Sequence, residues 1–476
     1  MSTGLSRPQS VPQKIAERIY RAQRTGVTFA RVYLGIKSQQ FIARRIRPPD
    51  MAERWSRLNR ESAESIYRCA IELRGLILKG CQFIGSRADV LPPEYIETLS
   101  KLQDRVPPKP FAVVRDCVEE AIQAPLEFVF EWFSETPIAS ASLAQVHEAR
   151  LRSGERVAVK VQYPEIAALV NSDLANIRTL FRAVGVIERD FDLMPLVEEL
   201  GAHVPLELDF INEGHNAERM AAFFADRDDV YVPAIHWEHT TRRVLVMELI
   251  EGIKISDAAG LRKAGLSPDS IMRTLIEAYC EQILRRGFFH ADPHPGNLMV
   301  QPGPPTRIVF LDFGLAKELP KEFQRGVVSF ASALLQGRTD EMTRALVELG
   351  FETRSGGANS AKPLAAIAER LLEVATRLRN QSYLERDAVR GAADDLVRLI
   401  RQDPIVRVPS HLIFVGRVVG LLSGLGRTLE AKVDMVQTIL PYIAESAQSA
   451  GASRATPERK SPDEGPREAD PDNAEC

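Results

Sequence analysis

The sequence has no run of about 18 consecutive apolar residues, the length that a bilayer-spanning helix needs. Its most apolar segment, residues 412–425, is interrupted by Arg417. The first 30 residues also lack the apolar core of a secretory signal. These absences predict a chain without a membrane span. The expected location is the cytoplasm or the cytoplasmic face of a membrane, and import into an organelle is left open.

Cysteine is sparse and scattered, and no C-x-x-C pair occurs. The five cysteines are Cys69, Cys81, Cys117, Cys280 and Cys476. This distribution argues against a zinc knuckle and a disulfide framework, and it suits a reducing compartment. The net charge of -3 gives no indication of nucleic-acid binding, and no such partner is expected.

Charge is unevenly spread at the two ends of the chain. Residues 1–50 contain ten Lys and Arg but only Glu17 and Asp50 as acidic residues. This arm is interpreted either as a basic helix on an anionic membrane surface or as a solvated helix packed on the main body. A transit peptide is a third interpretation, which the early Gln and Pro residues weaken. Residues 449–476 are poor in large apolar side chains and predict a disordered tail.

Between these ends, the pattern changes from helical to β-type and back. Apolar residues recur at helical spacing over 63–84 and 111–122, and short β-type runs cover 128–133, 144–151 and 156–161. Long helices are predicted at 166–184 and 193–222, a strand at 244–249, and mainly helix from Pro268. The predicted fold class is α+β. Its parts are a basic arm (1–55), a helical extension (56–124), a small β-rich lobe with a helical insertion (125–250), a large helical lobe (251–448) and the tail (449–476).

The first motif of functional interest is an alanine-rich hairpin at residues 139–146. Its spacing is that of a phosphate-covering G-x-G-x-x-G-x-V loop, with alanine at each glycine position. The candidate nucleotide-binding residues are Ala139, Ser140, Ala141, Ser142, Ala144 and Val146. Alanine disfavours positive φ, so this loop should be stiffer than a glycine loop. The hairpin alone is weak support for a nucleotide site.

Three further motifs follow in a fixed order. Lys160 ends an apolar strand fourteen residues after Val146, as in the V-A-I-K strand of kinases. Residues 290–297 have the spacing of H-R-D-x-x-x-x-N, in which Asp292 would orient or deprotonate the nucleophile and Asn297 would bind Mg²⁺. Asp312, fifteen residues later in D-F-G, would be the principal Mg²⁺ ligand. Together the four motifs predict a kinase-type site that takes ATP and Mg²⁺.

Two other interpretations of these residues compete with a kinase-type site. The motifs could be turns and strand ends of an unrelated α/β domain, which their matched order and spacing disfavour. His290, Asp292 and His294 could form an H-x-D-x-H transition-metal site. Asn297 and Asp312 fit magnesium better than zinc.

With these motifs in place, the chain resembles the UbiB/ADCK family of atypical, protein-kinase-like kinases over about residues 60–430. Residues 79–82 resemble its K-x-G-Q element, with 87–95 and 102–107 as the usual continuation, and 207–210 resemble its E-x-D signature. The resemblance implies a bilobal kinase-like fold and a pairing of Lys160 with Glu213. It also implies that Lys79 and Gln82 cover the nucleotide pocket, with Glu207 as the partner of Lys79. Cys81 departs from the pattern, which has glycine there.

The predicted hinge, whose backbone would receive adenine, is formed by Met247, Glu248 and Leu249. The predicted function is that of an atypical kinase or ATPase that supports the biosynthesis or handling of an isoprenoid quinone lipid. One alternative is a protein kinase acting on proteins, but no A-P-E motif follows D-F-G. The other is a catalytically silent, nucleotide-gated lipid scaffold, against which the intact Lys160, Asp292 and Asp312 weigh.

Overall fold

The computed structural model describes residues 11–85, 91–103, 108–164, 166–187, 194–353, 361–380, 405–407 and 410–455. The chain divides into two compact units. The first takes residues 1–319 and 410–434, and the second takes residues 320–409 and 435–476.

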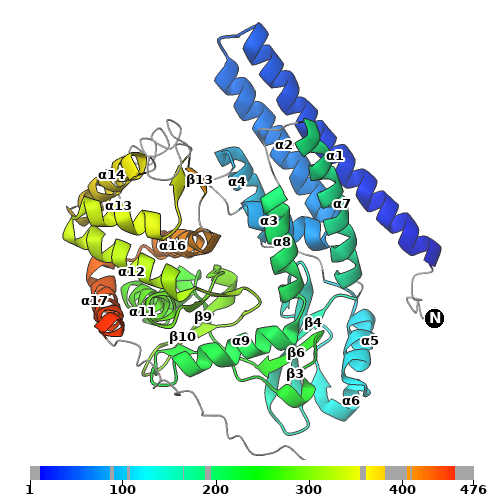
Figure 1. The fold of residues 1–476 in the computed structure, drawn as a ribbon. Coiled ribbons are helices and arrows are strands. Elements are labelled where there is room, and N and C mark those ends of the chain that lie inside the picture. Colours follow the sequence, from blue (N-terminus) through cyan, green and yellow to red (C-terminus); the bar gives the residue numbers. More distant parts are fainter. Residues whose placement is uncertain are drawn as a thin grey trace, which may run out of the picture. The chain divides into compact units, whose positions relative to one another are not determined.

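The N-terminal part of the first unit is helical (Figure 1). Its helices are α1 (Val11–Arg45), α2 (Met51–Leu73), α3 (Gly75–Gly85), α4 (Pro93–Leu99), the 3-10 helix η1 (Ser100–Gln103) and α5 (Phe111–Ile122). Ala70, Leu78 and Leu99 belong to one hydrophobic cluster that joins α2, α3 and α4. On α2, Ala63, Ile66 and Ala70 of this cluster recur at three- and four-residue spacing, which creates the buried face of the helix.

The single helix predicted over residues 63–84 is wrong, because it breaks between α2 and α3. Arg74 and Gly75 have φ angles of 54° and 56°, which a right-handed helix does not accommodate. Arg21 of α1 donates a hydrogen bond to the carbonyl oxygen of Leu73, one of the terminal carbonyls of α2. Arg21 also pairs with the buried Asp173. The break makes α3 a separate short helix.

An antiparallel sheet forms the small lobe. Its strands are β1 (Phe130–Phe133), β3 (Ala144–Leu151), β4 (Arg156–Gln162) and β6 (Val244–Glu248) in that order, with β2 (Ala139–Ser140) paired to the start of β3. The predicted strand at 128–133 begins late, because Leu126–Val129 form the short helix α6. Val157 and Val159 of β4 face the cluster that contains α5, whereas Ala158 faces Phe210 of α9. This alternation also places Lys160 on the α9 side.

Three helices form the insertion between β4 and β6. They are α7 (Ile166–Ile187), α8 (Met194–Glu207) and α9 (Phe210–Phe223). The sequence predicted one helix over 193–222, which is wrong because the chain breaks after Glu207. Asp209 caps α9, since its carboxylate accepts a hydrogen bond of 3.1 Å from the N–H of Ile211. Short polar side chains at this position favour a new helix start.

Helices and short strands form the rest of the first unit. The helical elements are η2 (Trp237–His239), α10 (Ala258–Lys263), α11 (Pro268–Cys280), the π-helical η3 (Glu281–Arg286), η4 (Pro295–Asn297) and α16 (Ser410–Leu429). The strands β5 (Val230–Tyr231), β10 (Arg307–Phe310), β9 (Leu298–Gln301) and β7 (Ile253–Lys254) form one sheet, and β8 (Phe288–His290) pairs with β11 (Ala316–Glu318). The antiparallel β9–β10 pair matches Leu298 with Phe310. It therefore brings the adjoining Asn297 and Asp312 to the same end of the hairpin.

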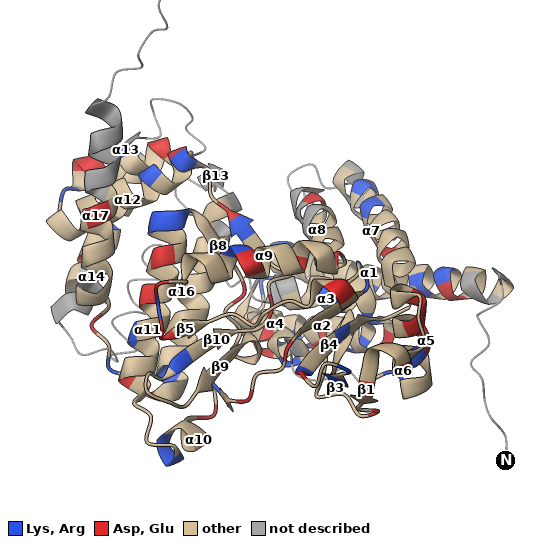
Figure 2. Cartoon of the chain, turned by 90° about the horizontal axis from the view of Figure 1, so that it is seen from below, with Lys and Arg blue, Asp and Glu red and all other residues tan. Residues whose placement is uncertain are grey.

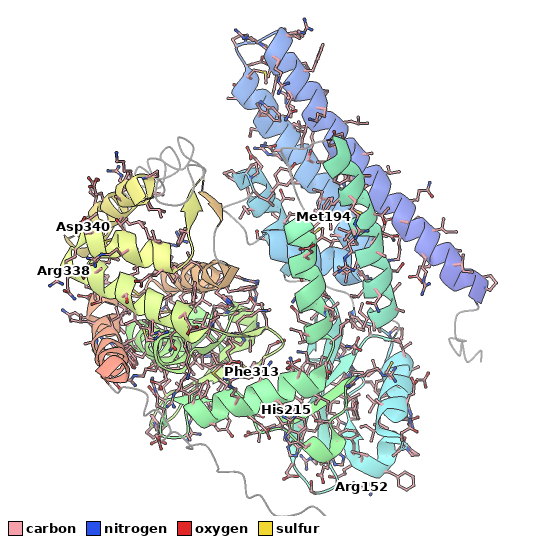
Figure 3. The ribbon with its side chains drawn as sticks, viewed as in Figure 1. Arg152, Met194, His215, Phe313, Arg338 and Asp340 are labelled. Atoms are coloured by element: carbon pink, nitrogen blue, oxygen red, sulfur yellow. The ribbon has the colours of Figure 1, made fainter. Side chains whose placement is uncertain are left out.

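The second unit is a helical assembly. It contains α12 (Lys321–Gln336), α13 (Thr339–Glu348), α14 (Ala361–Asn380), α17 (Met435–Ala455) and the paired strands β12 (Glu352–Thr353) and β13 (Ile405–Arg407). Met342, Leu346 and Leu364 belong to its hydrophobic cluster. Arg338 and Asp340 lie at the start of α13 (Figure 3).

Several predicted boundaries differ from the structure. The boundary at residue 55 falls inside α2, and the predicted large lobe (251–448) contributes to both units. The tail expected from residue 449 starts too early, because α17 continues to Ala455; residues 456–476 lie outside the described part. Within the described residues, no helix has the length and apolar character to cross a membrane.

Candidate functional site

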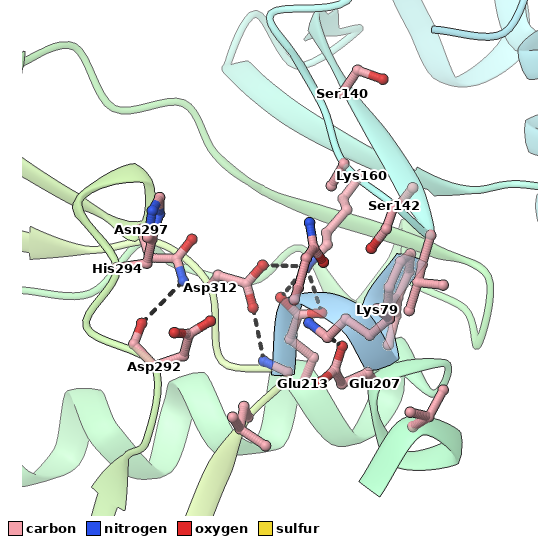
Figure 4. A pocket seen from close by; sticks show the side chains of 18 of the residues that line it. Lys79, Ser140, Ser142, Lys160, Glu207, Glu213, Asp292, His294, Asn297 and Asp312 are labelled. Carbon is pink, nitrogen blue, oxygen red and sulfur yellow. Dashed lines mark hydrogen bonds and ion pairs between the residues drawn. The ribbon is translucent and has the colours of Figure 1, made fainter. Parts of the chain in front are cut away.

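A pocket in the first unit collects most of the residues that the motifs predicted (Figure 4). It is lined by Lys79, Gln82, Ser140, Ala141, Ser142, Leu143, Ala144, Lys160, Val204, Glu207, Phe210, Glu213, Asp292, His294, Asn297, Asp312, Gly314, Leu315 and Arg417. These residues come from the alanine-rich hairpin, β4, α3, the end of α8, α9, the loop after β8, the loop after β10, and α16.

Lys160 lies between two carboxylates at the centre of the pocket. Its Nζ is 2.7 and 2.9 Å from the two carboxylate oxygens of Glu213 and 2.9 Å from Oδ2 of Asp312. Glu213 is 1% exposed and also accepts a long hydrogen bond from the N–H of Phe313. The Lys160–Glu213 pairing predicted from the sequence is therefore present. Because α9 carries Glu213 and β4 carries Lys160, the pairing ties the insertion to the sheet.

Mutual charge keeps Lys160 and Asp312 ionised. Burial opposes the charged form of Lys160, but Asp312 and Glu213 together raise the pKa of the lysine above its usual value. Burial would raise the pKa of Asp312, but Lys160 holds it well below its ordinary range. Burial raises the pKa of Glu213 to about 7, against the opposing effect of Lys160. A cation held in this way can meet phosphate oxygens without losing its proton.

The loop after β10 is held in place by His290 of β8 and by Asn216 of α9. The ring Nδ1 of His290 is 3.1 Å from the hydroxyl of Tyr279, and Nε2 bonds the carbonyl oxygen of Asp312. Asn216 of α9 donates a hydrogen bond of 3.2 Å to the carbonyl oxygen of Phe313, which lies beside that helix (Figure 3). The loop after β10 is thus held from two sides.

Asp292 and Asn297 lie on the same loop, the one after β8, and are joined by a hydrogen bond. The side-chain N–H of Asn297 donates a hydrogen bond of 3.1 Å to the main-chain oxygen of Asp292. This contact leaves the carboxylate of Asp292 and the amide oxygen of Asn297 as acceptor groups in the pocket (Figure 4). Burial works against the charge of Asp292, but Arg417 and Lys79 outweigh it, and the pKa of Asp292 lies below its usual value.

The donor set fits magnesium better than a transition metal. Asp312 and Asn297 supply hard oxygen ligands, and Mg²⁺ in phosphoryl-transfer sites is typically held by one or two carboxylates together with substrate phosphates. Both ring nitrogens of His290 have partners, and Nδ1 of His294 accepts a hydrogen bond from the N–H of Gly296. Across the described ranges, no group of three or more His, Cys, Asp or Glu residues could hold a metal ion. The H-x-D-x-H interpretation therefore has no support.

The alanine-rich hairpin contributes its turn to the pocket. Ala139 pairs with Val146 at the base of the hairpin, and the N–H of Ala141 donates a hydrogen bond of 2.8 Å to the carbonyl oxygen of Ala144. Residues 140–144 line the pocket, whereas Ala139 and Val146 are absent from its lining. Their role is to close the hairpin that positions the turn.

The α3 helix places two predicted residues at the pocket. Nζ of Lys79 is 2.7 Å from a carboxylate oxygen of Glu207, so the predicted pair is present. Burial opposes the charge of Lys79, but Glu207 and Asp292 raise its pKa. The side-chain N–H of Gln82 donates a hydrogen bond of 2.8 Å to the main-chain oxygen of Leu102. Of the predicted continuations at 87–95 and 102–107, residues 87–90 and 104–107 lie outside the described residues.

The side chain of Cys81 lies on a different side of α3 from those of Lys79 and Gln82. Its side chain packs against the hydrophobic cluster of α2, α3 and α4, and burial raises the pKa of its thiol to about 12. The thiol is thus a packing group. It does not line the pocket that Lys79 and Gln82 line.

The predicted hinge does not line the pocket in this structure. The N–H of Glu248 donates to the carbonyl oxygen of Ala234, and the N–H of Leu249 donates to that of Arg156. The carboxylate of Glu248 accepts a hydrogen bond of 2.6 Å from Tyr231. With both amide hydrogens used within the lobe, an adenine contact at these two residues remains a prediction.

Sequence reasoning missed Arg417 as a site residue. Its Nη2 is 2.8 Å from Oδ1 of Asp292, and both side chains are largely buried. The only sequence signal was a single charge inside the apolar segment 412–425.

Comparisons with known proteins match this chain to kinase-like proteins. The profile of the ABC1 atypical kinase-like domain matches residues 101–346. A chloroplastic "activity of bc1 complex kinase 8" from Arabidopsis thaliana is 33% identical over 79% of this chain and 53% of its own length. An uncharacterised Synechocystis protein is also 33% identical, over 82% of this chain and 70% of its own length. The mouse AarF domain-containing protein kinase 1 is 40% identical over 57% of this chain and 52% of its own length.

The chain thus spans about half the length of the Arabidopsis and mouse relatives. Among solved structures, a Mycobacterium tuberculosis protein in complex with erythromycin aligns with a TM-score of 0.58 and 24% identity. The alignment covers 81% of this chain and 97% of that one. At this identity the likeness concerns the fold, and it agrees with the kinase-like α+β fold that the motifs predicted.

Proposed function

Because the chain belongs to the ABC1 atypical kinase-like family, the UbiB/ADCK group that its motifs resemble, we propose that it binds Mg·ATP and transfers or hydrolyses the γ-phosphoryl group. The observation that carries the proposal is the contact of the largely buried Lys160 with both the buried Glu213 and the more exposed Asp312. A lysine fixed in this way beside a small-residue hairpin is the phosphate-holding arrangement of kinase-type sites.

Each group in the pocket has a task in this reaction. Lys160 would exchange part of its contact with Asp312 for phosphate oxygens, while Glu213 keeps its ammonium group in place. Asp312 and the amide oxygen of Asn297 would hold Mg²⁺, which when bound neutralises charge on the phosphates. Asp292 would orient the attacking hydroxyl or water. Positioning and charge stabilisation supply most of the rate enhancement in such reactions.

We further propose that the reaction supports the synthesis or handling of an isoprenoid quinone lipid, as the UbiB/ADCK resemblance implies. A protein acceptor is less well supported. Only residues 315–320 separate Gly314 of D-F-G from α12, which leaves little chain for a peptide-docking segment. The α3 helix also places Lys79 in the pocket.

The direct test is phosphate release from ATP by the purified protein. We expect slow, Mg²⁺-dependent turnover that increases when vesicles containing an isoprenoid quinone-precursor mimic are added. Phosphate transferred to an added protein would favour the protein-kinase alternative. Nucleotide binding without any turnover would favour the silent scaffold, and absence of both would contradict the proposal.

We also propose that α1 binds an anionic membrane surface. One side of the helix contacts the rest of the unit through the buried Arg21, which pairs with Asp173 of α7. Another side exposes Val27, Leu34 and Phe41, each more than half exposed. Their seven-residue spacing aligns them along one stripe, and α1 and α7 also carry Lys and Arg (Figure 2). Apolar side chains beside basic ones are typical of interfacial helices.

Replacing two apolar side chains of this stripe with serine should weaken the binding of the protein to vesicles. The double variant Leu34→Ser/Phe41→Ser removes two exposed apolar side chains, each contributing about 1.5–3 kcal/mol when buried. We expect at least a hundredfold lower partitioning onto phosphatidylserine-containing vesicles in cosedimentation. Phe128→Ser, at a residue that is 74% exposed on α6, is the matched control. Equal sedimentation of the wild type and the double variant would remove the membrane role of α1.

A further inference from the structure

Arg417 is a cation whose position the four sequence motifs do not explain. It lies on α16, between the buried Phe414 and Val418, and extends into the pocket. Its guanidinium is 2.8 Å from the carboxylate of Asp292, which is 125 residues away in sequence. Burying a guanidinium is costly, and a buried ion pair is a weak source of net stability. Its position in the pocket therefore points to a role in the chemistry.

The catalytic loop supplies no arginine of its own. Where kinases have H-R-D, this chain has His290, Ala291 and Asp292. Among the described residues that line the pocket, Arg417 is the single arginine, beside Lys79 and Lys160. Lys160 and Lys79 are both engaged with carboxylates away from Asp292, namely Glu213 and Glu207. Arg417 is the cation that directly contacts the residue expected to orient the nucleophile.

We infer that Arg417 acts as an internal arginine finger, which exchanges Asp292 for the transferring phosphoryl group. This inference rests on the proposed ATP reaction and deepens it. A planar guanidinium can donate two parallel hydrogen bonds to a carboxylate or to phosphoryl oxygens, so one can replace the other with little change in geometry. In phosphoryl transfer, negative charge lies on the equatorial oxygens, where an arginine donor stabilises it.

The reaction itself leaves Arg417 chemically unchanged. The bond between the γ-phosphorus and the β–γ bridging oxygen breaks, and its electron pair leaves with ADP. A new bond forms between that phosphorus and the oxygen of water or an acceptor hydroxyl, whose proton passes to Asp292 or to solvent. The exchange also frees the carboxylate of Asp292, which can then accept a hydrogen bond from the nucleophile.

The test separates transition-state binding from nucleotide binding. For Arg417→Gln, we expect turnover of Mg·ATP to fall by about a hundredfold to a thousandfold. We expect the affinity for Mg·ADP with aluminium fluoride, a mimic of the transferring phosphoryl group, to fall by about a hundredfold. The affinity for Mg·ADP alone should change less than threefold. Arg427→Gln, at an exposed arginine of the same helix, should leave all three quantities unchanged.

Other results of the Arg417→Gln experiment would overturn the inference or the proposed function. Unchanged or increased turnover, or equal losses of Mg·ADP and aluminium-fluoride binding, would overturn the inference in favour of a structural or inhibitory contact. If Arg417→Gln fails to fold, the affinity of Arg417→Lys for Mg·ADP with aluminium fluoride tests the inference instead. This variant keeps the charge but loses the planar fork, so a loss of aluminium-fluoride affinity of about tenfold is expected, and wild-type affinity would overturn the inference. Absence of turnover and nucleotide binding in the wild type would instead contradict the proposed function.

Discussion

Asp312→Asn should lower Mg·ATP turnover by about a thousandfold, because a charged metal ligand contributes several kcal/mol to charge stabilisation and each 1.36 kcal/mol changes the rate tenfold. The variant should fold, since Lys160 keeps its two hydrogen bonds to Glu213. An asparagine oxygen can also still accept the hydrogen bond that Gly314 donates to Asp312. The loss should therefore be specific to metal and nucleotide.

Thermal shifts test this specificity directly. In the wild type, adding Mg²⁺ to saturating ADP should increase the melting temperature further, and in Asp312→Asn this magnesium-dependent increment should disappear. Asp340→Asn, an exposed carboxylate at the start of α13, makes the same charge change as a control. A normal magnesium increment in Asp312→Asn would show that Asp312 is not a metal ligand.

The centre of the site could be predicted because local sequence determines it. The period of two in β4 assigns Lys160 to the face opposite Val157 and Val159. The short β9–β10 hairpin brings Asn297 and Asp312 together across fifteen residues. Such motifs keep their geometry because strand and turn lengths determine it.

The position of Arg417 and the break between α2 and α3 could not be predicted, because they depend on contacts that sequence spacing does not reveal. Arg417 meets Asp292 only because α16 packs in the same unit as the loop after β8. The break between α2 and α3 depends on left-handed backbone at Arg74 and Gly75 and on Arg21 from another helix. Helical periodicity continues across this break, so an apolar pattern alone predicts one helix.

The second large effect is expected on nucleotide affinity when Lys79 of α3 is replaced. Lys79→Ala removes the cation that pairs with Glu207 and leaves this carboxylate, 12% exposed at its side chain, facing the proposed phosphate-binding pocket. We expect the Kd for Mg·ATP to rise at least tenfold. The double variant Lys79→Ala/Glu207→Gln should regain part of the affinity, because no unpaired charge remains.

Removing Lys79 should also change which acceptors reach the pocket. If α3 covers the nucleotide as the family resemblance implies, trimming its lysine opens the site, and labelled phosphate should appear on the protein itself. Lys101→Ala, an exposed lysine of η1, is the matched control for a lost positive charge. Titration calorimetry and labelling of the four proteins, including the wild type, provide both readouts. Wild-type affinity and no labelling in Lys79→Ala would make α3 an ordinary structural helix.

Cys81→Gly completes this test, because it changes the same helix on its packed side. The thiol contacts the cluster of α2, α3 and α4, not the pocket, so glycine should reduce stability without tightening ATP binding. The expected destabilisation is about 1–2 kcal/mol, from the poor helix propensity of glycine and the lost packing. Chemical denaturation measures the stability, and calorimetry measures the affinity. Tighter ATP binding with unchanged stability would mean that Cys81 holds α3 away from the nucleotide. The packing seen here argues instead that α3 reaches the pocket through Lys79 and Gln82 despite the cysteine.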